Sequence, residues 1–175
     1  MSQITEKIVG LQLPSLIKKS QIRRQTVNYA DARRIGILVT LHDHEKQHTV
    51  DEFIEELAND EKDIEVLCYD KRRAGNKIFG YVQFDDKDIS LMGKIKNEYV
   101  IDFINTDFDY LMHLDMESTR VLDKMLVLSR AKCRVGADLP GHRDFYELMV
   151  KADSLFDLCE MMLRYTKIVS VKKAS

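Results

Sequence analysis

The sequence predicts an α/β fold: a three-layer Rossmann-like domain with a mostly parallel sheet and an amino-terminal helical arm. Residues 34–41 read RIGILVTL, a continuous apolar run rich in β-branched residues that is typical of a strand buried on both faces. Residues 109–136 read as a strand, an amphipathic helix and a second strand, and such a unit requires parallel strands. We therefore expect an arm over residues 1–33 and one α/β domain over residues 34–175.

The arm carries Ile4, Ile8 and Leu11 at helical spacing, and Pro14 is expected to divide it into two short helices. Residues 1–34 hold seven lysines and arginines against two acidic residues, which leaves −7 for the rest of a chain whose net charge is −2. An apolar stripe needs a hydrophobic partner, so we expect the arm to pack against its own domain, a protein partner or a second copy in a homo-oligomer. Nucleic acid is the weaker alternative, because the chain lacks a recognisable nucleic-acid module.

The first half of the domain contains a second buried strand and one clear helix signal. Thr49 and Glu52 have the spacing of a capping box and predict a helix that begins there. Residues 63–70 (DIEVLCYD) are predicted to form the second strand, which completes a first βαβ unit. Residues 77–84 (KIFGYVQF) alternate more loosely, so they indicate an edge strand or an excursion from the sheet.

The second half repeats the alternation of helices and strands. A helix is expected near residues 97–106, followed by a strand at 109–115, a helix that starts at Ser118 or Thr119, and a strand at 132–136. The segment DFYELMV is a candidate for one more strand. The last helix is expected to begin after a cap formed by Ser154 with Asp157.

Charged and histidine side chains follow the strands where each one ends. Ligands of open parallel sheets bind outside the carboxyl ends of the strands, so we take these side chains as the candidate site. All five histidines lie on or beside this edge. If they work together, they should converge around one pocket. The ligand-binding candidates are His42, Asp43, His44, Arg72, Arg73, Asp115 and Arg143.

Motifs that would specify a reaction or a cofactor are missing. The histidine-rich segment 42–48 offers ligand types suited to zinc or nickel, but without a helical or knuckle-like spacing it is better interpreted as a solvated loop. No GxGxxG, GxxxxGK[ST], GxSxG or HExxH motif occurs. We therefore predict no metal, no cofactor and no catalytic residue, and the missing motifs disfavour dinucleotide oxidoreductases, P-loop nucleotidases and α/β-hydrolases.

The cysteines and the amino terminus favour a cytoplasmic location. Cys68, Cys133 and Cys159 lie far apart inside apolar segments, as expected for core thiols in a reducing compartment. The first 20 residues interrupt their apolar positions with charged residues and a proline, so neither a signal peptide nor a membrane span is predicted.

The segment DYLMHLD, the helix after it and the strand AKCRVG resemble the amino-terminal domain of heptosyltransferase-like glycosyltransferases. There, a strand ending in Asp leads through a helix to an Arg-Val-Gly strand end. The resemblance covers residues 34–136 and implies a Rossmann-like fold. Such enzymes bind the nucleotide sugar in a second domain, which we expect this chain to lack, and they place a Gly-Asp step after the first strand, where Asp43 here follows His42. The whole chain also resembles a short uncharacterised bacterial family, a domain of unknown function.

These observations predict a non-catalytic cytoplasmic binding or interaction module without a membrane contact. The alternative is a small sugar-nucleotide-binding protein or enzyme related to glycosyltransferases. In that case Asp43 or His44 would act as the base, and Arg72 or Arg143 would hold the anion. A nucleic-acid-binding protein that uses the basic arm is the third possibility.

Overall fold

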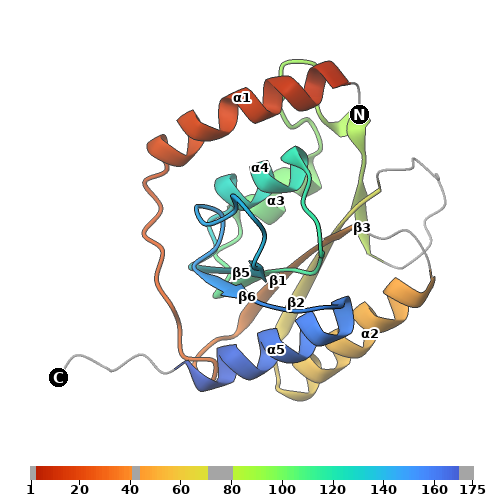
Figure 1. Ribbon diagram of the computed structural model, residues 1–175, viewed down its shortest axis with the longest axis vertical. Helices are drawn as coiled ribbons and strands as arrows, with labels where there is room; N and C mark the ends of the chain where they lie inside the picture. The colour runs from red at the N-terminus through yellow and green to blue at the C-terminus, as the bar shows by residue number, and fades with distance from the viewer. Residues whose placement is uncertain (1–2, 41–43, 71–80, 170–175) are drawn as a thin grey trace.

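The computed structural model describes residues 3–40, 44–70 and 81–169, with side chains from residue 6 onward. A six-stranded sheet lies in the middle of the domain, between two helical layers (Figure 1). Its strands are β1 (Arg34–Thr40), β2 (Asp63–Tyr69), β3 (Val82–Phe84), β4 (Tyr110–His113), β5 (Cys133–Ala137) and β6 (Leu148–Val150). The helices are α1 (Gln3–Lys19), α2 (His44–Asn59), α3 (Glu98–Asn105), α4 (Arg120–Leu128) and α5 (Leu155–Ile168), with a 3-10 turn η1 (Asp86–Asp88).

All six strands are parallel, in the order β3-β2-β1-β4-β5-β6. The predicted α/β Rossmann-like class is confirmed, and so are the four parallel strands expected from the sequence. β1 is central: Ile37 pairs with Val66 of β2 on one side and with Met112 of β4 on the other. The order of the strands reverses between β1 and β4, so the carboxyl ends of these two strands flank the point where such sheets bind ligands.

The helices divide between the two faces of the sheet. Figure 1 places α2 and α5 on one face and α3 and α4 on the other, with α1 outside α4. Each face has its own hydrophobic core, because alternate residues of the buried strands point to opposite sides. Ile37 and Met112 belong to the core under α2 and α5, whereas Leu38 and Leu111 belong to the core under α3 and α4.

Most predicted helix starts are confirmed by their caps. The hydroxyl of Thr119 accepts the Leu122 amide at 3.3 Å, Asn97 caps α3, and Ser154 caps α5. The predicted start of α2 at Thr49 is wrong, because α2 already begins at His44. Thr49 lies inside the helix, and its hydroxyl donates to the Glu45 carbonyl one turn earlier. No cap is needed at Thr49, because only the first amides of a helix lack partners and α2 begins five residues earlier.

The prediction of two short helices in the arm is also wrong, since α1 runs unbroken through Pro14. Val9 and Leu13 are buried against the domain, and this packing holds the helix together despite the missing amide at Pro14. The predicted apolar stripe is shifted as well: Leu11 is 81% exposed. Tertiary contacts with α4 therefore select a different face of α1 from the one that spacing suggested.

The segment that joins α1 to β1 is held by specific hydrogen bonds. The Arg24 guanidinium donates to the carbonyl of Val127 in the last turn of α4 and to that of Ala131 beyond it, and the Gln25 amide donates to the Lys132 carbonyl. Burial, followed by the nearby charge of Arg134, lowers the pKa of Arg24 to about 10. One of the arm's basic residues is thus part of the domain's own packing.

Candidate functional site

A cleft of about 1130 Å³ opens at the carboxyl ends of β1 and β4, at the reversal of the strand order. Its floor is formed by the last residue of β1 and by the loop that follows β4. Helices α1, α2, α4 and α5 contribute the walls. Ligand sites in parallel sheets occupy this position because the connecting loops separate there and leave backbone and side-chain groups accessible.

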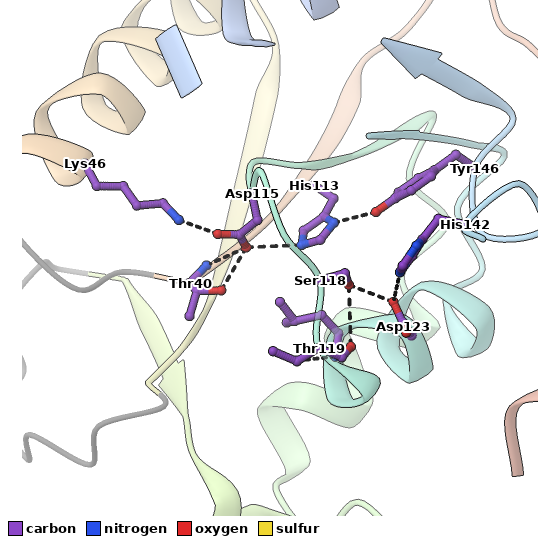
Figure 2. Close-up of polar contacts among 10 residues, drawn as sticks. Thr40, Lys46, His113, Asp115, Ser118, Thr119, Asp123, His142 and Tyr146 are labelled. Carbon is purple, nitrogen blue, oxygen red and sulfur yellow. Dashed lines mark hydrogen bonds and ion pairs between the residues drawn. The ribbon is translucent and has the colours of Figure 1, made fainter. Parts of the chain in front are cut away.

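Asp115 lies in the floor of the cleft, and its side chain is only 6% exposed. Its Oδ2 accepts the amide and the hydroxyl of Thr40, at 2.9 and 2.8 Å. Its Oδ1 accepts the ammonium of Lys46 on α2. Figure 2 shows these groups and His113 converging on the one carboxylate. The carboxylate therefore joins β1, β4 and α2 at a single point.

The electrostatics of this cluster keep Asp115 ionised. Burial alone would raise the pKa of its carboxyl, but the hydrogen bond from His113 and the charge of Lys46 hold the pKa below the ordinary value. Lys46, whose side chain is only 18% exposed, has this buried carboxylate as its counter-ion. The floor of the cleft is a neutralised ion pair that is already organised without a ligand.

His113 is fully buried and extends the cluster to Tyr146. Its Nε2 lies 3.1 Å from Asp115 Oδ2, and its Nδ1 lies 2.6 Å from the Tyr146 hydroxyl. Nε2 donates to the carboxylate, and Nδ1 accepts from the phenol, so a neutral ring satisfies both contacts. A protonated ring would leave the Tyr146 proton without an acceptor among the described residues. Burial raises the pKa of Tyr146 well above its ordinary value, in agreement with a protonated phenol.

A second polar cluster surrounds Asp123 in the first turn of α4. Its side chain is 2% exposed. Oδ1 accepts the Ser118 hydroxyl at 2.7 Å and lies 3.1 Å from His142 Nε2, while Oδ2 lies 3.4 Å from the Arg120 guanidinium. In Figure 2 Ser118 and His142 approach this carboxylate from two sides. The cluster attaches the β5–β6 loop, which carries His142, to the start of α4.

The rim of the cleft adds apolar surface to this polar interior. Met116, Leu155 and Phe156 line it, and Phe156 is 58% exposed at the start of α5. A large exposed aromatic side chain beside hydrogen-bonding groups is the usual composition of a site for a small organic ligand. The cleft can therefore contact both the polar groups and the apolar face of one molecule.

The predicted site residues are distributed unevenly around this cleft. Asp115 lines it, whereas His44, the first residue of α2, and Arg143, exposed next to His142, are not among its lining residues. The other four predicted residues lie outside the residues that the structure describes. They are His42, Asp43, Arg72 and Arg73.

Sequence reasoning missed Lys46, Tyr146 and Asp123. Lys46 lies within α2 rather than directly after a strand, and Tyr146 lies in a loop that reaches back to β4. Asp123 had a signal that could have been used: an acidic residue in the first turn of a helix whose start was predicted correctly. The other two give no such signal, because their partners are distant in sequence.

Thiol and metal chemistry find little support among the described residues. Cys68, Cys133 and Cys159 are buried, and burial raises the pKa of both Cys133 and Cys159 to about 12. Over residues 3–40, 44–70 and 81–169, no three His, Cys, Asp or Glu side chains are arranged to hold a metal ion. In the same part of the chain, no helix has both the length and the apolar composition to cross a membrane.

The chain belongs to a family of unknown function, DUF6913, whose model matches residues 6–169. The match includes α1 as well as the α/β domain, so the arm is part of what defines the family. Neither the curated proteins nor the solved structures contain a match to the chain.

Proposed function

We propose that the protein is a non-catalytic binding module that holds a small polar organic molecule in the cleft between the ends of β1 and β4. The observation that carries this proposal is the cleft itself: about 1130 Å³ at the reversal of the strand order, above a floor already neutralised by Lys46 and Asp115. A pre-organised floor favours binding, because the polar groups need not rearrange when a ligand enters.

A binding role fits the titratable groups of the cleft better than a catalytic role. Asp115 is held ionised by its hydrogen bonds, and a carboxyl with a lowered pKa is a poor proton donor or acceptor near neutral pH. Tyr146 is held protonated. Among the described residues, the side chains that could form a thiolate are buried in the core.

The lining suggests the chemistry of the ligand. The Arg120 guanidinium and the Thr119 hydroxyl supply hydrogen-bond donors on one side of the cleft, whereas the Ser118 hydroxyl already donates to Asp123. Phe156 and Met116 supply an apolar surface on which a ring can stack. We infer a ligand that combines a ring or another flat apolar face with several hydrogen-bonding groups.

A sugar nucleotide is one molecule of this kind, and the sequence resemblance to glycosyltransferases of the heptosyltransferase type keeps it as the alternative ligand. A cytoplasmic location and a bacterial origin belong to the same proposal; the buried free thiols support the location. Nucleic-acid binding through the arm is less well supported, because Arg24 is engaged with backbone carbonyls of the domain.

The test is a ligand screen by thermal shift and ligand-observed NMR, using a metabolite library that includes nucleotides and nucleotide sugars. Phe156→Ala and Arg120→Ala should each weaken the binding of a specific ligand by about fivefold or more, since each contact contributes roughly 1 kcal/mol or more. The matched controls are Tyr165→Ala and Arg164→Ala, exposed residues of α5 that do not line the cleft. Absence of any ligand with a Kd below about 1 mM, or equal losses in the controls, contradicts the proposal.

A further inference from the structure

Three helices begin at the cleft, an arrangement that favours anions in many parallel sheets. α2 begins at His44, α4 at Arg120 and α5 at Leu155, and the first turn of each contributes to the lining. The amides at the start of a helix carry a partial positive charge, so phosphates commonly bind there. The charge that a ligand meets in this cleft therefore depends on the side chains that already face these amides.

Each of the three helix starts carries a carboxylate of its own. Glu45 lies in the first turn of α2, Asp123 in that of α4 and Asp157 in that of α5. On α5, the Asp157 carboxylate accepts the Asp153 amide at 3.0 Å, and the Ser154 hydroxyl accepts the Asp157 amide at 3.2 Å. An acidic residue in the first turn offsets the partial positive charge of the helix start. The three helix starts consequently attract a phosphate only weakly.

The side chains that line the cleft are also predominantly negative. Five carboxylates line it, against three lysine and arginine side chains, so the carboxylates are in excess even when His142 is counted as a cation. Asp115 and Asp123 have cationic partners. The other three carboxylates form no ion pair with another residue that the structure describes; they are Glu6, Glu45 and Glu117.

These carboxylates approach the cleft from both faces of the sheet. Glu45 belongs to α2, whereas Glu6 belongs to α1, which lies outside α4 over the other face (Figure 1). A cleft with low-dielectric walls concentrates the field of the charges that line it. A cationic group between the two faces is attracted from both sides, and a phosphate is repelled from both.

Phe156 adds a feature that suits an organic cation. Its ring is 58% exposed and lines the cleft at the start of α5. The face of an aromatic ring attracts ammonium groups, and a flat apolar part of a ligand can stack on it. A metal ion is less well served, because within residues 3–40, 44–70 and 81–169 no three His, Cys, Asp or Glu side chains are grouped to hold one.

We propose that the cleft binds an organic ammonium compound with a flat apolar part and excludes ligands that carry phosphate. This inference rests on the proposed function, since it names the charge of the molecule that the cleft holds. The ammonium group donates to carboxylates of the lining, and the flat part contacts Phe156. The inference separates an amine from the sugar nucleotide that the sequence resemblance suggests as the alternative ligand.

The sign of the field can be measured without a ligand, from the paramagnetic relaxation that two small nitroxides of opposite charge cause at amide protons. The probes are aminomethyl-PROXYL, a cation, and carboxy-PROXYL, an anion. At the amides of Arg120 and Phe156, the cation should cause an enhancement about twofold larger than the anion does. Amides next to Lys18 and Lys19, in the last turn of α1, should show the opposite preference and provide an internal reference.

Neutralising two carboxylates should reduce this preference. Glu45 and Glu117 are exposed, so the double variant Glu45→Gln, Glu117→Gln should fold and bring the two enhancements at the cleft amides closer together. Glu61→Gln removes the same charge in the turn before β2, at the opposite edge of the sheet, and should leave the cleft amides unchanged. An enhancement by the anion that equals or exceeds that by the cation overturns the proposal, and so does an unchanged preference in the double variant.

Two ligands with the same ring test the charge selection directly. Tryptamine carries an ammonium group and indole-3-acetate a carboxylate on one indole ring. In NMR titrations of the cleft amides, tryptamine should bind about fivefold more tightly or better, the strength of an exposed charge pair. Tighter binding of indole-3-acetate or of UDP-glucose in the cleft overturns the ammonium ligand and leaves the proposed function standing. A preference for the cationic nitroxide without any ligand in the metabolite screen contradicts the proposed function instead, and the nitroxides decide the sign of the charge even where neither indole binds.

Discussion

The two histidine–aspartate pairs at the carboxyl edge differ in the second partner of the histidine. His113 lies between Asp115 and the Tyr146 hydroxyl, which can donate a proton to the ring. His142 lies between Asp123 and the carbonyl oxygen of Pro140. Each imidazole therefore touches one carboxylate, but its other nitrogen meets a hydroxyl in one pair and a backbone carbonyl in the other. The second contact of His113 reaches a residue that is distant in sequence, whereas the second contact of His142 stays within its own loop.

The two carboxylates also differ in the burial of their cationic partners. Asp115 has the Lys46 ammonium as a counter-ion, and the Lys46 side chain is only 18% exposed. Asp123 has Arg120 on one oxygen at 3.4 Å, and the Arg120 side chain is 55% exposed. The floor of the cleft is thus a buried ion pair, whereas the pair at Asp123 reaches solvent. We expect the floor to contribute more to stability, because water screens the pair of Asp115 and Lys46 less.

Removing the carboxylate of the floor should have the largest effect. We expect Asp115→Ala to lower the free energy of unfolding by about 3–5 kcal/mol, because Lys46 and the Thr40 amide lose a buried acceptor. Urea denaturation measures this change. Asp107→Ala serves as the control, since its pair with Arg130 is exposed and should contribute less than about 1 kcal/mol. Equal losses in the two variants would mean that the floor is not a buried unit.

Acid denaturation should test the contribution of the same carboxylate to stability without a mutation that creates a cavity. The pKa of Asp115 is lowered in the folded protein, so its stabilising contribution is complete above the unfolded value of about 3.9 and is lost as the pH falls through the folded value. We expect the unfolding free energy of the wild type to fall below about pH 4 more steeply than that of Asp115→Asn. Denaturation curves at a series of acidic pH values provide the comparison, and parallel curves would contradict it.

Displacing Tyr146 should disturb the floor but leave the Asp123 oxygens in place. A Cβ added at Gly136 would lie 2.2 Å from Tyr146 Cε1, so Gly136→Ala must push the ring away from His113. We expect a loss of about 1–3 kcal/mol in thermal or chemical unfolding. In Gly10→Ala the nearest atom is 3.7 Å away, on Arg120, and this helical position should tolerate or favour alanine. If Gly136→Ala leaves the free energy of unfolding unchanged, the Tyr146 ring has room to move.

The smallest effect is expected from deleting a single hydroxyl. Tyr146→Phe keeps the ring but removes the proton donated to His113, and should lower the unfolding free energy by about 1 kcal/mol. Tyr165→Phe, on the exposed surface of α5, should be neutral. In long-range ¹H–¹⁵N NMR spectra of the histidine side chains, Tyr146→Phe should alter the signals of His113 and leave those of His142 unchanged. A change at His142 instead would mean that the two pairs are coupled.

Sequence patterns predicted the sheet well because its determinants are local. The apolar run over residues 34–41 and the alternation of strands with amphipathic helices suffice to predict parallel strands, and β1, β2, β4 and β5 lie close to their expected bounds. Caps at Thr119 and Ser154 depend on a side chain and an amide three residues away. The errors concern α1, which continues through Pro14 because it packs against the domain, and α2, which begins at His44 rather than at the local signal of Thr49.

The candidate site was only partly predictable for the same reason. Asp115 was found because it follows a strand, and the position of a strand end can be read from periodicity. Its partners include Lys46 of α2 and Thr40 at the end of β1. The contact of His113 with Tyr146, in the loop before β6, spans 33 residues. No spacing in the chain encodes such a contact.

By itself, then, the sequence determined the fold class, the parallel strands and the edge where polar groups gather, since these follow from periodicity and from the geometry of βαβ units. Tertiary structure alone decided which face of α1 is buried, which groups meet on Asp115 and Asp123, and what lies on the far side of each imidazole. A hydrogen bond requires atoms within about 3 Å of each other, and only the folded chain brings distant residues that close.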